Sequence, residues 1–359
     1  MRVPHLRSAV FLTLLLLPRP GHAAIADSLH VRSLSAFPIV MYDSDIGIGL
    51  GAKSLLRNGF GHDESLDLLV FFSSKGEQWY VLAGSIPDPE LRQGRRFAGA
   101  LDIKLEFDKL LKSNYFGLGN GTDDNEHQFP KEFWTLQLTL GTAPHPRLIG
   151  EIVGRLTHYA IYGYDPAWGT ITAGTAGAGE SFVAAFGARI RWDGRDSSVN
   201  PRKGWRVVAG VDLARPEMGS DWRFTVFRLE SSLYASLARD HVIAGRWWMQ
   251  SVDGVAPYVE LSKVGDSWTA RGFKADRFLD RAMTLSSMEY RFPLYRRLGG
   301  VAFVDVGRVW PCLHDLSLRD WHADAGGGLR YYLANFVTRL DVGSSNEGTR
   351  IFLQFGHVF

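Results

Sequence analysis

The 359-residue sequence contains a single cysteine, Cys312, so no disulfide can form within the chain. It also lacks an excess of one charge, because 40 basic and 38 acidic residues are mixed along its length and leave a formal net charge of +2. Nucleic-acid-binding proteins usually concentrate basic residues on one face. We therefore expect no nucleic-acid partner.

Short motifs of enzymes and cofactor-binding proteins are missing as well. The eleven histidines show no H-E-x-x-H spacing, and no G-x-S-x-G occurs. The glycines of 114–126 are not followed by the Gly-Lys-Ser/Thr of a phosphate loop. The acidic residues Asp123, Asp124 and Glu126 favour a solvated turn over a calcium site. We expect no cofactor, no metal and no enzymatic activity.

Only one continuous apolar run stands out, and it lies at the N-terminus. Arg2 and Arg7 precede the apolar residues 9–17, and small residues follow up to Ala23. This order is typical of a secretory signal peptide, here residues 1–23, although cleavage after Ala26 and a short buried helix are the alternatives. No later stretch has 18 consecutive apolar residues, so the sequence predicts no transmembrane helix.

Apolar residues alternate with polar ones along most of the remaining chain. In 97–107, for example, Ile103 and the residues two positions before and after it are apolar. Lys104 and the residues two positions before and after it are charged. A period of two predicts a strand whose two faces meet different environments. Fifteen such runs are clear: 37–56, 64–74, 77–87, 96–107, 131–142, 149–162, 181–192, 204–214, 222–236, 242–257, 283–294, 299–310, 322–333, 335–344 and 349–359.

Strand number and length favour a transmembrane antiparallel β-barrel over a soluble sandwich. Runs of about ten residues exceed the usual five or six of soluble strands. Bacterial single-chain barrels usually have an even number of strands, so we adopt a weaker run at 169–177 as the seventh of 16. The predicted domains are a short periplasmic segment at 24–36 and the barrel at 37–359, in the bacterial outer membrane with lipid around it.

Aromatic residues cluster near the ends of these runs. Such rings are typical of the two girdles at the membrane–water boundaries of a barrel. The expected girdle residues are Trp79, Tyr80, Phe133, Trp134, Trp205, Trp222, Trp247, Trp248 and Trp310. The final run places Phe355 and Phe359 on one face, which resembles the C-terminal signal by which outer-membrane barrels are recognised by the barrel assembly machinery during biogenesis.

Motifs in the second half resemble those of the BamA/TamA superfamily of outer-membrane assembly proteins, the bacterial surface antigen family. "ARGF" at 270–273 resembles the family's [VI]RG[FY], with Ala270 in place of Val or Ile. "MEYRFPL" at 288–294 and "FVDVG" at 303–307 resemble the motifs that follow it. A periplasmic turn motif is also present, with Arg195, Asp196, Asn200, Pro201 and Gly204. The resemblance covers the chain well from about residue 180 onward and only loosely before it.

The resemblance implies that the sixth extracellular loop folds into the barrel lumen. Alternation adds that Glu289 and Asp305 face the lumen from adjacent strands, where one guanidinium can bind both carboxylates. Gly272 would allow a close backbone approach, and the ring of Phe273 would pack inside. We call the predicted set the lumen latch: Arg271, Gly272, Phe273, Glu289, Asp305 and Gly307. The alternative is an exposed arginine with a marginal surface ion pair.

The resemblance also implies a role in inserting or transporting proteins or lipids at the outer membrane. Members that recruit client proteins carry periplasmic POTRA domains before the barrel, and the segment 24–36 has no room for one. We therefore expect a periplasmic partner protein to supply that function. Two alternatives stay open: a passive pore or structural barrel, and a barrel-embedded lipid hydrolase with a serine paired with His158 or His241.

Overall fold

The computed structural model describes residues 31–124, 127–162, 177–333 and 337–359. The predicted signal peptide lies outside the described residues. Among the described residues, no helix is long and apolar enough to cross a membrane. Helical structure there is confined to short pieces, such as α2 (Pro89–Arg92), which lies in the connection between the strands at 78–86 and 97–115.

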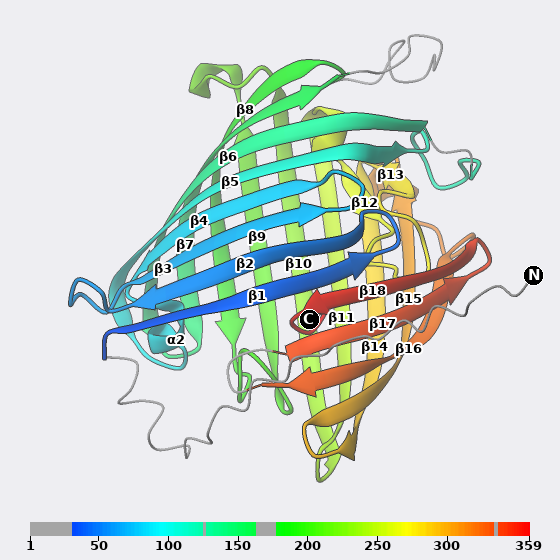
Figure 1. Cartoon of the computed structure of the whole chain (residues 1–359). Helices are drawn as coiled ribbons and strands as arrows, with labels where there is room; N and C mark the ends of the chain where they lie inside the picture. The colour runs from blue at the N-terminus through cyan, green and yellow to red at the C-terminus, as the bar shows by residue number, and fades with distance from the viewer. Residues whose placement is uncertain (1–30, 125–126, 163–176, 334–336) are drawn as a thin grey trace, which may run out of the picture.

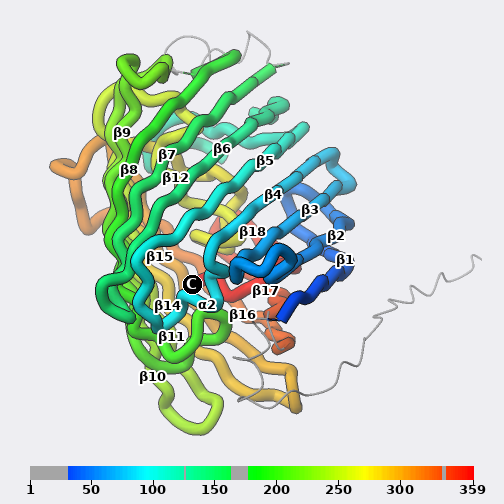
Figure 2. Tube along the Cα trace, turned by 90° about the vertical axis from the view of Figure 1, so that its left-hand side faces the viewer, coloured from blue at the N-terminus to red at the C-terminus, as the bar shows by residue number. Residues whose placement is uncertain are grey.

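Sixteen antiparallel strands close into a single barrel (Figure 1), which confirms the predicted fold class. The first eight are β1 (Ser33–Asp43), β2 (Gly47–Arg57), β3 (Ser65–Ser73), β4 (Gln78–Ile86), β5 (Phe97–Tyr115), β6 (His127–His145), β7 (Leu148–Ile161) and β8 (Glu180–Asp193). The second eight are β9 (Gly204–Ala214), β10 (Arg223–Ala238), β11 (His241–Val255), β14 (Ala282–Tyr295), β15 (Leu298–Trp310), β16 (His322–Tyr332), β17 (Val337–Ser345) and β18 (Gly348–Phe355). Figure 2 shows the tilt of the strands around the barrel.

Successive side chains on each strand meet opposite environments, as a closed sheet requires. On β14, Met288 and Tyr290 are exposed on the outer wall, and Glu289 between them is fully buried in the lumen. On β5, Ile103 faces outward with 40% of its surface exposed. The outer wall is therefore an apolar band, and most charged side chains of the strands point into the lumen.

The connection between β11 and β14, residues 256–281, is hereafter loop 6. It contains a 3-10 turn, η3 (Tyr258–Glu260), and a small hairpin of β12 (Ser262–Val264) and β13 (Phe278–Asp280). Apolar side chains of the loop pack against the inner faces of β14 and β15, in a cluster of Val264, Ala270, Phe273, Phe278, Met283, Leu285 and Val309. Loop 6 therefore lies inside the barrel.

Two strand predictions need correction. The run at 37–56 is two strands, because the chain turns at residues 44–46 and β1 pairs with β2 along its whole length. That turn has neither glycine nor proline, so the run looked continuous. The run at 169–177 falls almost entirely outside the described residues, and β7 pairs directly with β8. The total of sixteen is therefore reached without it.

The predicted aromatic girdle is only partly correct. Tyr80 and Trp134 face outward and contact Phe107 between them, with ring centres 5.6 and 4.4 Å away. Trp205 and Trp247 are also exposed. Three other members of the prediction that lie in strands point inward: Trp79, Phe133 and Trp248. Trp310 has the same outward parity as Val304 on β15, but it is only 2% exposed and its ring lies 5.6 Å from that of Trp321. Inward aromatics fill the lumen, so position near a strand end does not by itself show which face a ring occupies.

We predict opposite outcomes for two neighbouring substitutions on β5. Ile103→Arg places a charge on the apolar outer wall, at a cost of about 2–4 kcal/mol near a bilayer midplane. Lys104→Ala removes a lumen side chain that pairs with Glu106 on the same strand, so we expect a small effect. The measurement is the fraction of heat-modifiable, folded protein in membranes. Equal yields for the two variants would contradict the assignment of faces.

Candidate functional site

Arg271 of loop 6 lies at the centre of a buried network in the lumen, and its side chain is 0% exposed. Its guanidinium makes a two-pronged contact with Asp305 of β15, with Nε 2.7 Å from Oδ2 and Nη2 3.1 Å from Oδ1. Nη1 donates to Glu289 Oε1 of β14 at 2.7 Å. The structure thus brings together the three charged residues predicted for the lumen latch.

Two further wall residues complete the surroundings of Arg271. Asp341 of β17 accepts a third contact from Nη1, at 3.4 Å. The guanidinium also lies over the ring of Phe303 on β15, with its central carbon 3.4 Å from the ring centre. Phe303 is opposite Glu289 in the strand register, so it forms the surface on which the arginine rests. This stacking adds a cation–π attraction. A lysine could not stack in this way, because its ammonium is a compact point charge and not a planar group.

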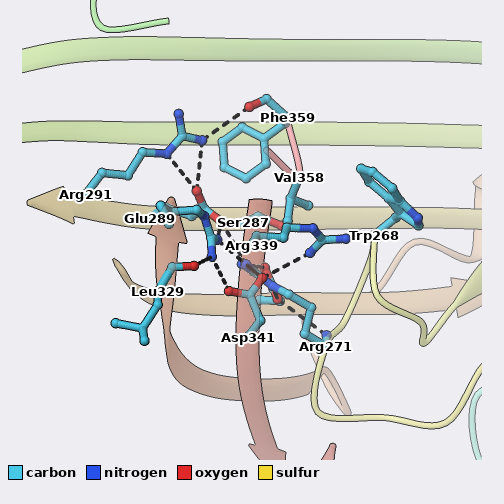
Figure 3. Close-up of polar contacts among 12 residues, drawn as sticks. Trp268, Arg271, Ser287, Glu289, Arg291, Leu329, Arg339, Asp341, Val358 and Phe359 are labelled. Carbon is cyan, nitrogen blue, oxygen red and sulfur yellow. Dashed lines mark hydrogen bonds and ion pairs between the residues drawn. The ribbon is translucent and has the colours of Figure 1, made fainter. Parts of the chain in front are cut away.

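The network extends to three more arginines that sequence reasoning did not identify (Figure 3). Arg330 of β16 and Arg339 of β17 bind Asp341, at 2.5 and 3.0 Å. Arg291 of β14 donates through Nε to Glu289 Oε2 at 2.8 Å. Alternation alone placed such residues on the inner face, but pairing them requires knowledge of which strands are neighbours.

Glycines allow loop 6 to approach the wall closely. A Cβ on Gly272 would lie 2.5 Å from Asp324 Cβ, and one on Gly343 of β17 would lie 2.5 Å from the Arg271 carbonyl oxygen. Gly307 of β15 likewise leaves room for Val264 of the loop, 2.8 Å from the position of a Cβ. The glycines at 272 and 307, predicted as latch residues, therefore stand at points of close packing.

The ring of Phe273 is buried beside the latch. It makes an edge contact with Phe278 of β13, with ring centres 5.3 Å apart, and lies 5.9 Å from the ring of His322 on β16. His322 in turn stacks on Phe278 at 3.6 Å. Phe273 thus joins the tip of loop 6 to its own hairpin and to the barrel wall.

Loop 6 has a second buried anchor that the sequence did not indicate. Glu260 of η3 accepts two bonds from Arg155 of β7, at 2.7 and 2.9 Å, and one from the Tyr159 hydroxyl at 2.6 Å. Burial raises the pKa of Glu260, but the charge and hydrogen bonds of Arg155 outweigh it and the net pKa is lowered. The carboxylate therefore stays ionised and ties the loop to the opposite wall.

Residues 119–122, in the connection between β5 and β6, contact loop 6 and the end of β15. Arg277 of loop 6 donates to the Thr122 hydroxyl and carbonyl oxygens, both at 2.8 Å. Asn120 accepts from the Val309 amide at 3.2 Å, and Gly119 pairs with Leu279 of β13. The segment "YFGLGN", for which the sequence offered no chemistry, thus contributes contacts to loop 6 and to β15.

The predicted turn motif lies between β8 and β9 and holds that turn together. Arg195 binds Asp193 through two bonds, at 2.7 and 2.8 Å, and Asp196 accepts the backbone amides of residues 202 and 203. Gly204 has a φ of +101°, and a Cβ there would be 2.2 Å from the Gly194 carbonyl oxygen. Pro201 is buried, and Asn200 contacts the C-terminal segment.

Phe359 does not continue the face of Phe355, contrary to the prediction. Strand β18 ends at Phe355, and Gly356 has a φ of +84° that turns the chain away from the strand. The ring of Phe359 then lies among lumen side chains, with the guanidinium of Arg246 5.0 Å from its centre. The glycine in the sequence was the available signal for this break.

Comparison with known proteins identifies the family of this barrel. The model of the Omp85 superfamily domain matches residues 134–357, more than half of the chain. The chain belongs to the Omp85 superfamily. Omp85 barrels of this type are proteins of the bacterial outer membrane, and this chain lies there too. Three strands, β9, β10 and β11, separate the turn between β8 and β9 from loop 6, and each strand crosses the membrane once. Loop 6 and that turn therefore lie on opposite sides of the membrane.

A named relative is the outer membrane protein assembly factor BamA of Nitratidesulfovibrio vulgaris, 26% identical over 291 residues. The match covers 78% of this chain and 32% of the relative, so the chain spans about a third of that protein. BamA of Haemophilus ducreyi lacking POTRA domains 1–3 has a similar fold, with a TM-score of 0.65, 14% identity, and coverage of 91% of this chain and 70% of that one. CdiB of Escherichia coli is also similar, with a TM-score of 0.62, 13% identity, and coverage of 89% and 62%.

We predict that Arg271→Ala destabilises loop 6 by about 3–5 kcal/mol, because it leaves buried carboxylates without a cation. Asp305 loses the guanidinium that binds both of its oxygens, whereas Glu289 keeps Arg291. Arg271→Lys should recover only part of the loss, since an ammonium lacks the two-pronged geometry. The measurement is protease cleavage within loop 6 of folded, heat-modifiable protein, with Arg281→Ala, an exposed arginine of the same loop, as control.

A double variant separates a direct contact from a general weakening. Arg271→Ala combined with Asp305→Ala should be milder than the sum of the two single changes, because the unpaired carboxylate is removed with its cation. Strictly additive effects would show that Arg271 and Asp305 do not interact directly. A loop protected from protease as well in Arg271→Ala as in the wild type would show that Arg271 does not anchor it.

Proposed function

We propose that this chain is an assembly or translocation barrel of the outer membrane, which admits a segment of a client polypeptide through the seam between β1 and β18. The name of the N. vulgaris relative, an assembly factor, agrees with this class of function. The observation that carries the proposal is the short strand pairing between β1 and β18.

Pairing at the seam involves only one end of the two strands. Along β1, every residue from Ser33 to Asp43 has a partner on β2. On the β18 side, the strand pairing joins Tyr42 and Asp43 to Leu353 and Phe352. Within the described residues, the stretch 38–41 of β1, directly before this pair, has no strand pairing with β18 and so has an open edge there. The neighbouring pair β17–β18 is joined along the length of β18.

An open strand edge presents unpaired backbone donors and acceptors, which an extended segment of another chain can complete. In a bilayer, where water cannot satisfy these groups, the gain from such pairing is larger than in solution. An incoming strand would thus bind first to β1 and could then leave sideways into lipid. This is the physical basis on which the barrel would assist insertion of a client.

The two alternative functions have less support in the geometry. A passive pore needs an open lumen, whereas loop 6 is pinned there by Arg271 and by Glu260. For a lipid hydrolase, His241 would need a serine, but its Nδ1 bonds to the Tyr290 hydroxyl at 2.7 Å. His158 lies in the register of β7 opposite Trp134. Neither histidine is placed in a nucleophilic arrangement by these contacts.

We predict that a disulfide across the seam abolishes client assembly without unfolding the barrel. Tyr42→Cys and Leu353→Cys would be introduced together in a Cys312→Ser background, since these two positions are direct Cα partners. With the variant as the only copy in its host, oxidation should lower the amount of other folded barrels, or of translocated polypeptide, in the outer membrane. Reduction should restore it.

The matched control joins two outward positions on β15 and β16, Val304→Cys with Ala325→Cys, which are also Cα partners. This pair should form its disulfide and leave client assembly unchanged under oxidation. Normal assembly with a fully oxidised seam would show that clients do not pass between β1 and β18.

A further inference from the structure

Three aromatic rings meet on the outer wall, at the end of the barrel that carries the turn between β8 and β9. The ring of Trp192 on β8 stacks on that of Trp205 on β9, with ring centres 5.6 Å apart and planes 20° apart. His145, the last residue of β6, also stacks on Trp192, at 5.6 Å. We call these three side chains the ring stack. Figure 2 shows the strands β6 to β9 side by side on one wall.

The ring stack faces lipid and not the lumen. Trp205 is 47% exposed, and Ile190, two residues before Trp192 on the same face of β8, is 62% exposed. Gly150 of β7 is the Cα partner of Ile190, and a Cβ added there would have open space around it. An apolar surface with a hollow at Gly150 therefore runs from the ring stack toward the middle of the membrane. Aromatic rings in this position are typical of the boundary between lipid tails and headgroups.

Two cations flank the ring stack. Arg147, in the turn between β6 and β7, and Lys203, directly before β9, are exposed, and neither side chain makes an ion pair or a hydrogen bond with another described residue. A Cβ on Gly194 would lie 3.4 Å from Trp192 Nε1 and 3.9 Å from Arg147 Cδ, so these two side chains meet beside this glycine. Lys203 belongs to the same turn as Gly194, where its carbonyl oxygen accepts the Asp196 amide at 3.1 Å.

The acidic side chains of the turn between β8 and β9 do not neutralise these cations, because each already has partners. Arg195 binds Asp193 through two bonds, at 2.7 and 2.8 Å. Asp196 accepts the backbone amides of residues 202 and 203, at 2.9 and 3.2 Å. The charge beside the ring stack is therefore positive. Guanidinium and ammonium groups in such a position bind phosphate oxygens through charge-assisted hydrogen bonds.

The place of these groups favours a lipid over an acidic protein as the partner. Strand β6 ends at His145 and β7 begins at Leu148, so Arg147 lies directly at the end of the wall, where lipid headgroups surround the barrel. An acidic protein in the aqueous space would meet the cations but not the rings on the membrane side. A lipid with an anionic phosphate meets the cations with its headgroup and the rings and apolar surface with its tails.

We propose that Arg147, Lys203 and the ring stack form a binding site for one anionic phospholipid of the leaflet on this side of the membrane. Its phosphate lies beside the two cations, and a tail lies along the apolar surface beside Gly150. The site is on the wall opposite β1 and β18 in the strand order, so it does not depend on the client path proposed above. A lipid held there fixes the height of this wall in the membrane.

The test is lipid binding to the full chain, folded in detergent micelles, checked by heat-modifiability and titrated in native mass spectrometry. The probes are dioctanoyl phosphatidylglycerol, dioctanoyl phosphatidylcholine, which has the same tails and no net charge, and glycerol 3-phosphate, which has no tails. We expect the first phosphatidylglycerol to bind at least about tenfold more tightly than phosphatidylcholine, the order expected for two basic side chains near a headgroup. Glycerol 3-phosphate should also bind at least about tenfold more weakly than phosphatidylglycerol, because it buries no tail.

Charge variants locate the preference. Arg147→Gln with Lys203→Gln should remove the preference for phosphatidylglycerol and leave the binding of phosphatidylcholine unchanged. Arg147→Lys with Lys203→Arg keeps both charges and should keep the preference. The matched control is Arg95→Gln with Arg96→Gln, which removes two exposed charges from the connection between β4 and β5 at the same end of the barrel. This control should keep the preference.

A ring variant tests the aromatic part of the site. Trp192→Leu removes the ring that contacts the other two and keeps an apolar side chain. It should weaken both lipids by about fivefold, the order of a lost aromatic contact. Unchanged binding of both lipids in this variant would exclude the rings from the site and overturn the proposal.

Three other results would also overturn it. Equal binding of the two lipids by the wild type would show that the cations do not select the headgroup. Glycerol 3-phosphate bound as tightly as phosphatidylglycerol would show a site for free phosphate. A preference lost equally in the control variant would show that any positive charge at this end of the barrel acts in the same way.

Discussion

A guanidinium with no exposed surface must find its counter-charges inside the molecule, and most of this lumen is arranged around that requirement. Arg271 meets Asp305, Glu289 and Asp341 from three strands and rests on an aromatic ring. Removing the ion from water costs several kcal/mol, which only such complete pairing offsets. The glycines that let the loop backbone reach the wall are part of the same solution, because a bulkier residue would hold the charge too far from its partners.

The wall and the centre of this site were predictable because alternation fixes which side chains face inward. Once Met288 and Tyr290 are assigned to lipid, Glu289 can only face the lumen, and Asp305 follows from the same reasoning. Arg330 and Arg339 were not found, because alternation gives their direction but not their partners. Trp79 and Trp248 were misplaced because aromatic rings suit both a membrane boundary and a filled lumen. The path of residues 356–359 depends on the turn at Gly356, which a period of two cannot reveal.

Glu289 connects two features that are separate in the sequence. One of its oxygens accepts from Arg271 of loop 6, and the other accepts from Arg291, which also contacts the C-terminal residue. Loop 6 and residues 356–359, which follow β18 directly, therefore lie in one continuous set of buried contacts that meets at this carboxylate.

The partners of Arg271 all come from β14, β15 and β17, which lie in the last quarter of the chain and, together with β16, form one continuous part of the wall. This placement constrains the order of folding. We expect loop 6 to dock while the sheet is still open, since threading its folded hairpin into a finished cylinder would first require breaking backbone ladders. The junction of β1 and β18, with its short strand pairing, is then the natural place for the closing step, after the C-terminal strands and loop 6 have come together.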